Sequence, residues 1–227
     1  MREGPWPRRR PPRPMASMGA AAIAILGIAV GGGCLPKAPV IVDFAPVGRI
    51  YHGADYPDVY ERWTRHDKVL HDVDTALEVW ATYKSEEFRE AFVAHYAEAY
   101  ALEDGERERL RQTQREASAA SYDFLVTAQS SSYPWNDIEK KNSPWRVSLL
   151  DGAGHALAPD ELTFERLPDL FEREFYPAKT PFTKTYAIRF NRPSEHDDGF
   201  VGERSGSLTL RLAGPFGHVD LVWRGRS

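Results

Sequence analysis

The chain has 227 residues, of which 42% are hydrophobic and 12% aromatic, so it can build a globular core and is too apolar for a disordered protein. Its net charge is −4, and near −8 without residues 1–34, which argues against nucleic acid as a partner because phosphate contacts need clustered Lys and Arg. A single cysteine excludes an internal disulfide and a zinc site built from several cysteines.

The first 36 residues have the layout of an export signal. Residues 1–14 are rich in Arg and Pro, and no charge follows until after Pro36. The apolar run at 20–30 has the length of a signal-peptide core and is short for a membrane span. Glycines at 31–33 then leave an accessible backbone for a peptidase. Met1, Met15 and Met18 all remain possible start sites.

The segment ends in "VGGGC", which resembles the signal of bacterial lipoproteins. The resemblance implies a signal peptide at 1–33 and a lipidated Cys34 as the first mature residue, so that the membrane becomes a partner through acyl chains. Leu35 after the cysteine implies outer-membrane sorting, facing the periplasm or the cell surface. The resemblance covers about 20 residues and departs from the class at Gly31, where Leu is favoured. An uncleaved signal-anchor helix and a buried core helix are the alternatives.

Residues 34–56 read as a lipidated tether, and residues 57–121 as a helical region. Apolar residues with helical spacing predict a first helix from about 59 to 83: Trp63, Leu70, Val73, Leu77 and Trp80. Ser85 is the expected N-cap of a second helix, and the charged segment 106–121 is expected to form a third helix or an extension of the second. The second helix carries an aromatic stripe that we interpret as its packing face or as a partner-binding groove: Phe88, Phe92, Tyr96 and Tyr100.

Residues 122–227 predict a sheet-rich region. Short alternating or β-branched runs separated by turn residues predict strands at 122–129, 145–150, 161–167, 182–190, 207–213 and 218–224. The segment "LPDLFEREFYP" is expected to form a short helix between strands. The predicted fold is therefore α+β, with an N-terminal helical hairpin or three-helix layer followed by an antiparallel β-sandwich-like domain.

The best candidate for chemistry is a polar stripe on the expected first helix. Taken at 100° per residue, four side chains fall on one face of that helix: Asp67, His71, Asp74 and Glu78. Imidazole and carboxylates one turn apart can bind a divalent metal, or a carboxylate can orient the histidine as a base. The alternative is a solvated face or a set of salt bridges.

Two tryptophans flank a polar loop and are candidate binding residues, since exposed Trp often anchors an interface: Trp135 and Trp145. The alternative is that they pack at the edge of the sheet. The sequence contains no glycine-rich phosphate loop, dinucleotide fingerprint or His-Glu-x-x-His zinc motif, so we expect no cofactor.

These patterns favour a membrane-anchored, extracytoplasmic lipoprotein that acts without catalysis as an envelope interaction or assembly component, with an envelope protein as partner. One alternative is a metal-dependent or hydrolytic envelope enzyme that uses the stripe around His71. A second is a binder of a soluble ligand in a pocket between helices and sheet. A deep apolar pocket between those layers would favour the ligand binder.

Overall fold

The computed structural model describes residues 40–45, 48–178, 180, 182–193 and 199–226. The chain divides into residues 1–37 and a second unit of residues 38–227. The predicted signal peptide and Cys34 lie outside the described residues.

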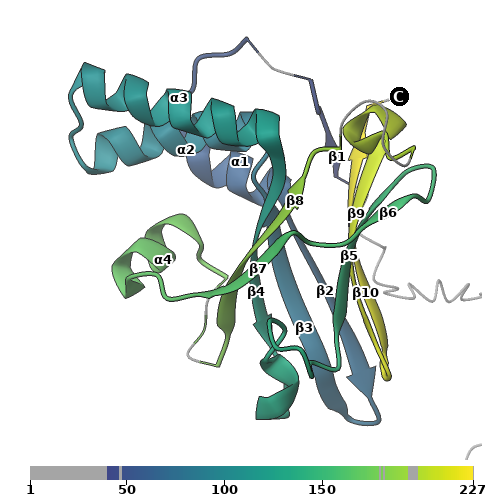
Figure 1. Cartoon of the computed structure of the whole chain (residues 1–227). Coiled ribbons are helices and arrows are strands. Elements are labelled where there is room, and N and C mark those ends of the chain that lie inside the picture. The colour runs from purple at the N-terminus through teal and green to yellow at the C-terminus, as the bar shows by residue number, and fades with distance from the viewer. Residues whose placement is uncertain (1–39, 46–47, 179, 181, 194–198, 227) are drawn as a thin grey trace, which may run out of the picture. The chain divides into compact units, whose positions relative to one another are not determined.

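Two five-stranded sheets form the centre of the second unit (Figure 1). The first sheet has the order β1-β10-β9-β5-β6, made from Ile41–Val42, Gly217–Gly225, Ser207–Gly214, Arg146–Asp151 and Ala156–Leu157. The second sheet has the order β2-β3-β4-β8-β7, made from Thr64–His71, Asp74–Tyr83, Ser121–Gln129, Lys184–Asn191 and Glu161–Glu165. All neighbours are antiparallel except β1 and β10.

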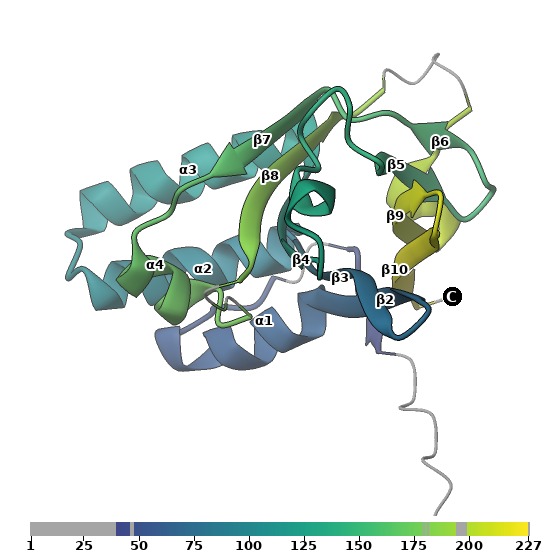
Figure 2. The ribbon, with the colours of Figure 1, turned by 90° about the horizontal axis from the view of Figure 1, so that it is seen from below.

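The sheets and helices lie in three layers, and the second sheet, of order β2-β3-β4-β8-β7, is the middle layer (Figure 2). One face of the middle sheet packs on the first sheet, where the large rings of Trp63, Tyr83 and Trp223 are fully buried. Burying a side chain of this size contributes about 1.5–3 kcal/mol each, so this face supplies much of the core. The Trp63 carbonyl also accepts a hydrogen bond from Trp223 Nε1, at 2.9 Å, which joins the end of α1 to β10.

Four helices cover the other face of the middle sheet: α1 (Tyr56–Trp63), α2 (Glu86–Ala99), α3 (Asp104–Ala120) and α4 (Asp169–Phe175). Short 3₁₀ turns occur at Gly53–Asp55 (η1), Tyr133–Asn136 (η2) and Gly202–Ser205 (η3). An aromatic cluster fills the space beneath the helices and includes Tyr56, Phe88, Phe92 and Phe175. The helices therefore enclose a second apolar region, which is continuous with the core between the sheets.

The predicted N-terminal helical layer is wrong. Its first helix ends at Trp63, and residues 64–83 form the β2–β3 hairpin. These two strands are part of the middle sheet and contribute side chains to the core. Leu77, Val79 and Tyr83 alternate into the core, as strand geometry requires, whereas Val73 is 96% exposed at the turn. Leu70 and Val73, which complete the apparent helical spacing, are both exposed and do not belong to the core.

Several local elements are confirmed. Ser85 caps α2, since its Oγ accepts a hydrogen bond from the Phe88 amide at 3.1 Å. α4 forms in the segment predicted as a short helix, and β4, β5, β7, β8, β9 and β10 fall at the predicted strands. Two sheets packed face to face are compatible with the predicted sandwich, but they include β1, β2 and β3 from before residue 121.

Within the described ranges, every helix is too short or too polar to cross a bilayer.

Candidate functional site

The four residues of the predicted metal stripe do not converge, because they lie on a hairpin instead of one helix. Asp67 faces the opposite side of the sheet from Glu78, since Glu78 pairs with Lys68 and side chains alternate along a strand. His71 and Asp74 are cross-strand neighbours near the turn. In the part of the chain that the structure describes, no cluster of three or more His, Cys, Asp or Glu could hold a metal.

Three of the four residues of the stripe have a local structural contact. Glu78 accepts hydrogen bonds from Gln129 Nε2 at 2.6 Å and from the His66 ring at 2.9 Å, if that ring nitrogen carries the proton. The His71 ring lies 4.5 Å from the ring of Phe216. Asp67 accepts a bond from the Asp220 amide at 3.3 Å, which ties β2 to β10. These contacts favour a structural role for the stripe.

The two candidate tryptophans pack inside the fold. Trp145 is 3% exposed, and its Nε1 donates to the Trp135 carbonyl at 2.9 Å. Trp135 is partly buried against Phe216, with ring centroids 4.5 Å apart. Neither ring is presented as an exposed anchor for a partner.

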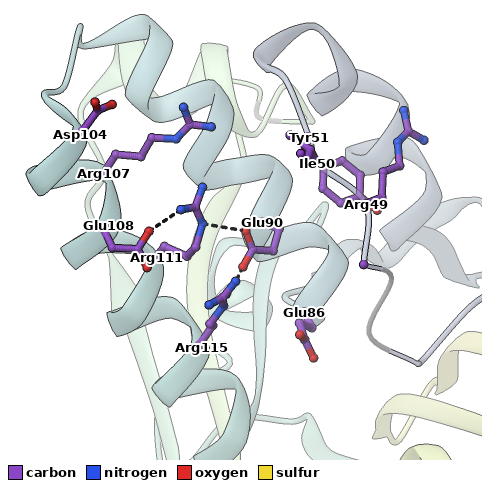
Figure 3. Close-up of a pocket in the computed structure, with 11 residues that line it drawn as sticks. Arg49, Ile50, Tyr51, Glu86, Glu90, Asp104, Arg107, Glu108, Arg111 and Arg115 are labelled. Carbon is purple, nitrogen blue, oxygen red and sulfur yellow. Dashed lines mark hydrogen bonds and ion pairs between the residues drawn. The ribbon is translucent and has the colours of Figure 1, made fainter.

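The larger of two candidate pockets, about 860 Å³, lies between α2, α3 and residues 48–51 (Figure 3). Its charged side chains balance, with four arginines (49, 107, 111 and 115) and four acids (86, 90, 104 and 108). Arg111 bonds both Glu90, at 3.1 Å, and Glu108, at 2.5 Å, while Arg115 bonds Glu90 at 2.9 Å. Half of these charged side chains therefore pair with one another, and the lining has no net charge, as in a solvated groove between helices.

The second pocket, about 300 Å³, lies between the helices and the middle sheet. Its apolar walls come from α2, β4, β8 and the segment around α4: Phe88, Phe92, Leu125, Leu167, Phe171, Tyr176 and Ala187. Three polar residues complete the lining: Lys84, Gln114 and Glu165. An apolar concavity with a few polar groups is the usual form of a small-molecule site.

Lys84 is the unusual member of this lining. It is partly buried between the end of β3 and the N-cap of α2, and no hydrogen bond or ion pair joins its Nζ to another residue of the described ranges. Burial, with the nearby positive charge of Arg89, lowers the pKa of Lys84 to about 8 although Asp123 and Glu165 act in the opposite direction. At neutral pH Lys84 is therefore mostly protonated, and no carboxylate of the described residues bonds its Nζ directly.

The wall beside Lys84 is a fixed polar network. Arg89, 4% exposed, donates to Asp123 at 2.5 Å, to Gln114 Oε1 at 2.6 Å and to the Lys84 carbonyl at 2.9 Å. Arg189 adds a bond to Asp123 at 3.0 Å. Burial alone would raise the pKa of Asp123, but the two arginines hold it below its ordinary value. Because Asp123 is committed to these arginines, it is not a counter-ion for Lys84.

The bond from Arg89 also orients Gln114. Its Oε1 faces Arg89, so its Nε2 donor has no partner among the described residues. Lys84 and Gln114 thus offer two donors in one apolar pocket, with Glu165 as the only carboxylate in the lining. This arrangement can hold an anionic head group while the rings of Phe92 and Phe171 contact an apolar tail.

Sequence reasoning did not select Lys84. It did single out the aromatic stripe as a possible groove, and two of its four members, Phe88 and Phe92, line the pocket. The sequence feature that could have indicated Lys84 is its position directly before the predicted N-cap, between an apolar run and a helix. Glu165 and Gln114 could not be predicted from local sequence, because sheet pairing and helix packing bring them to the pocket.

Comparison with known proteins gives no further guide to the site. No family model, no curated protein and no solved structure matches the chain.

Proposed function

We propose that this chain is a membrane-anchored, extracytoplasmic binding protein whose pocket between α2, α4 and the middle sheet takes a small amphipathic carboxylate. The observation that carries the proposal is Lys84, which lines a largely apolar pocket and has no direct ion pair among the described residues. A ligand carboxylate would supply the missing counter-ion, and a charge-assisted bond of this kind contributes about 1.5–3 kcal/mol.

The size and charge of the pocket define the ligand class further. A volume of about 300 Å³ is at the small end for ligand pockets, which suits one ring or a short chain. Glu165 would repel a second negative charge, so a monocarboxylate fits better than a dicarboxylate.

Titration calorimetry of the full-length chain in detergent tests this proposal, with 3-phenylpropanoate and the matched alcohol 3-phenylpropan-1-ol as probes. We expect Lys84→Met to weaken carboxylate binding at least about tenfold, a loss of about 1.4 kcal/mol, and to change alcohol binding little. Glu165→Gln should strengthen carboxylate binding by removing a like charge. Lys68→Met, at an exposed lysine on β2, is the control. Equal binding of the two probes, or no effect of Lys84→Met, would refute the proposal.

The membrane anchor is proposed from the sequence alone. The lipoprotein-like signal supports acylation of Cys34, which would place the domain at the outer membrane, facing the periplasm or the cell surface. Two or more acyl chains make such attachment stable, because each buried methylene contributes about 0.8 kcal/mol.

A second candidate function is the envelope interaction or assembly role. Val73 and Phe182 are 96% and 81% exposed, and they line one shallow hollow of about 370 Å³ near the turn of the β2–β3 hairpin. Exposed apolar side chains that share a hollow favour a protein partner at this end of the domain. Replacing both with Asp should abolish capture of that partner from envelopes while leaving carboxylate binding unchanged.

A further inference from the structure

The pocket has a feature that anion binding does not require, namely a lysine and a glutamate together in a lining that is otherwise largely apolar. We propose that Lys84 captures small aldehydes with an apolar tail as a reversible imine in this pocket. The inference uses the same pocket as the proposed function, but it does not depend on a carboxylate in the ligand.

The backbone holds Lys84 in place on both sides. Its amide donates to the Asp123 carbonyl at 2.9 Å, and its own carbonyl accepts from Arg89 Nε at 2.9 Å. The next residue, Ser85, is fixed as the N-cap of α2. The side chain therefore starts from a rigid point and lines a pocket together with Phe92, Phe171 and Tyr176. A lysine on a fixed backbone beside an apolar cavity matches the setting in which desolvated lysines act as nucleophiles.

The protonation state suits the reaction. Burial lowers the pKa of Lys84 to about 8, so about half of its amines are unprotonated at pH 8. An ordinary lysine, with a pKa near 10.4, is less than about 1% unprotonated at that pH. Only the unprotonated amine attacks a carbonyl carbon, which gives Lys84 an advantage over exposed lysines.

The chemistry needs no other reactant. The Nζ lone pair forms a bond to the carbonyl carbon, and the carbonyl oxygen gains a proton, which gives a carbinolamine. The C–O bond then breaks, and water leaves as the C=N bond forms, so amine and aldehyde yield imine and water without oxidation or reduction. Glu165 is the carboxyl group in the lining that can accept the ammonium proton and return it to the departing hydroxyl.

Reductive trapping tests the proposal on the full-length chain in detergent. With 3-phenylpropanal and cyanoborohydride at pH 8, we expect alkylation of Lys84 to be at least about tenfold faster than that of exposed Lys68, as mapped by peptide mass spectrometry. Lys84→Arg keeps a cation and should lose this fast site. Because Glu165 raises the pKa of Lys84, rates are compared per unprotonated amine. On that basis Glu165→Gln should slow alkylation of Lys84 while it strengthens carboxylate binding, a pair of opposite effects that a merely structural role would not produce.

Alkylation of Lys84 no faster than that of Lys68 would overturn the inference. If calorimetry still shows carboxylate binding that depends on Lys84, the proposed function stands and imine capture alone fails. If Lys84 reacts quickly but 3-phenylpropanoate neither binds nor slows the reaction, imine capture stands and the carboxylate function fails.

Discussion

At the scale of single residues, Lys84 links the pocket to the pH dependence of folding. An unfolded lysine keeps its proton up to about pH 10.5, whereas burial lowers the pKa of Lys84 to about 8 in the folded chain. Between these values the unfolded chain binds more protons, so the Lys84 contribution to stability increases as pH rises and is least favourable below pH 8.

We therefore expect Lys84→Met to be more stable than wild type at pH 7 by about 1–3 kcal/mol, because methionine fills similar space without a charge to desolvate. The difference should shrink between pH 8 and pH 10. Urea denaturation at pH 7 and pH 9.5 measures it. A difference that stays constant over this range would show that Lys84 is not desolvated.

Arg89 is the second residue on which the pocket depends, because it bonds Asp123, Gln114 and the Lys84 carbonyl. Its side chain and that of Asp123 are 5% and 11% exposed. Removing one partner of a buried ion pair leaves an uncompensated charge, so we expect Arg89→Met to destabilise the fold by about 3 kcal/mol. Arg109→Met, at an exposed position on α3, is the control and should change stability by less than about 0.5 kcal/mol.

The sign of the pH effect gives a second check on this pair. The pKa of Asp123 is lowered on folding, so its contribution to stability is full above the unfolded value and is lost as pH falls through the lowered one. The difference between wild type and Arg89→Met should therefore decrease in acid, below about pH 4. An unchanged difference at pH 3 would mean that the pair contributes little.

At the scale of elements, the β2–β3 hairpin is where local pattern and structure disagree. Its turn has a positive φ of 55° at Asp72, the first of the two residues between His71 and Asp74. Glycine adopts this conformation without strain, as in the type II′ turns that suit hairpins. We expect Asp72→Gly to stabilise the fold by up to about 1 kcal/mol.

This substitution also distinguishes the two interpretations of the segment. Within a continuous helix, glycine at position 72 would cost about 1 kcal/mol relative to a good helix former. Val73→Gly is the matched control, because Val73 lacks a positive φ and should show no gain. Chemical denaturation of both variants reports the sign, and destabilisation by Asp72→Gly would contradict the hairpin.

The same hairpin shows why part of the fold could not be predicted. Residues 64–83 contain both a helical spacing and the alternation of Leu77, Val79 and Tyr83, and short segments with both patterns are not decided by local sequence. In contrast, β9 and β10 alternate cleanly around a turn with Gly and Pro, and Ser85 precedes two glutamates, so these elements were predictable.

At the scale of the whole molecule, the candidate site depends on pairings that no local pattern encodes. Leu125, Ala187 and Glu165 meet because β4, β8 and β7 are neighbours on the face that α2 and α4 cover. Lys84 then becomes desolvated by packing of segments far from it in sequence. The sequence predicts the aromatic stripe of α2 as a buried face, but it does not predict that the charged Lys84 lines the same pocket.

The whole molecule is also the scale of the anchor. We expect metabolic labelling with a palmitate analogue to modify the wild-type chain, and Cys34→Ser to abolish the label and release the domain from membranes, since one sulfur atom carries the proposed attachment. The Lys84→Met variant is the control, because its pocket change should leave labelling intact. A label that survives Cys34→Ser would contradict this assignment.

The pKa of Lys84 itself tests the central claim most directly. Lysine Nζ and Cε resonances can be followed by NMR across a pH titration, with and without saturating 3-phenylpropanoate. We predict a pKa of about 8 in the empty pocket and a clear rise when the ligand carboxylate supplies the counter-ion. A value near 10.5 that does not respond to the ligand would show that Lys84 is an ordinary surface lysine and that the pocket does not bind this class of molecule.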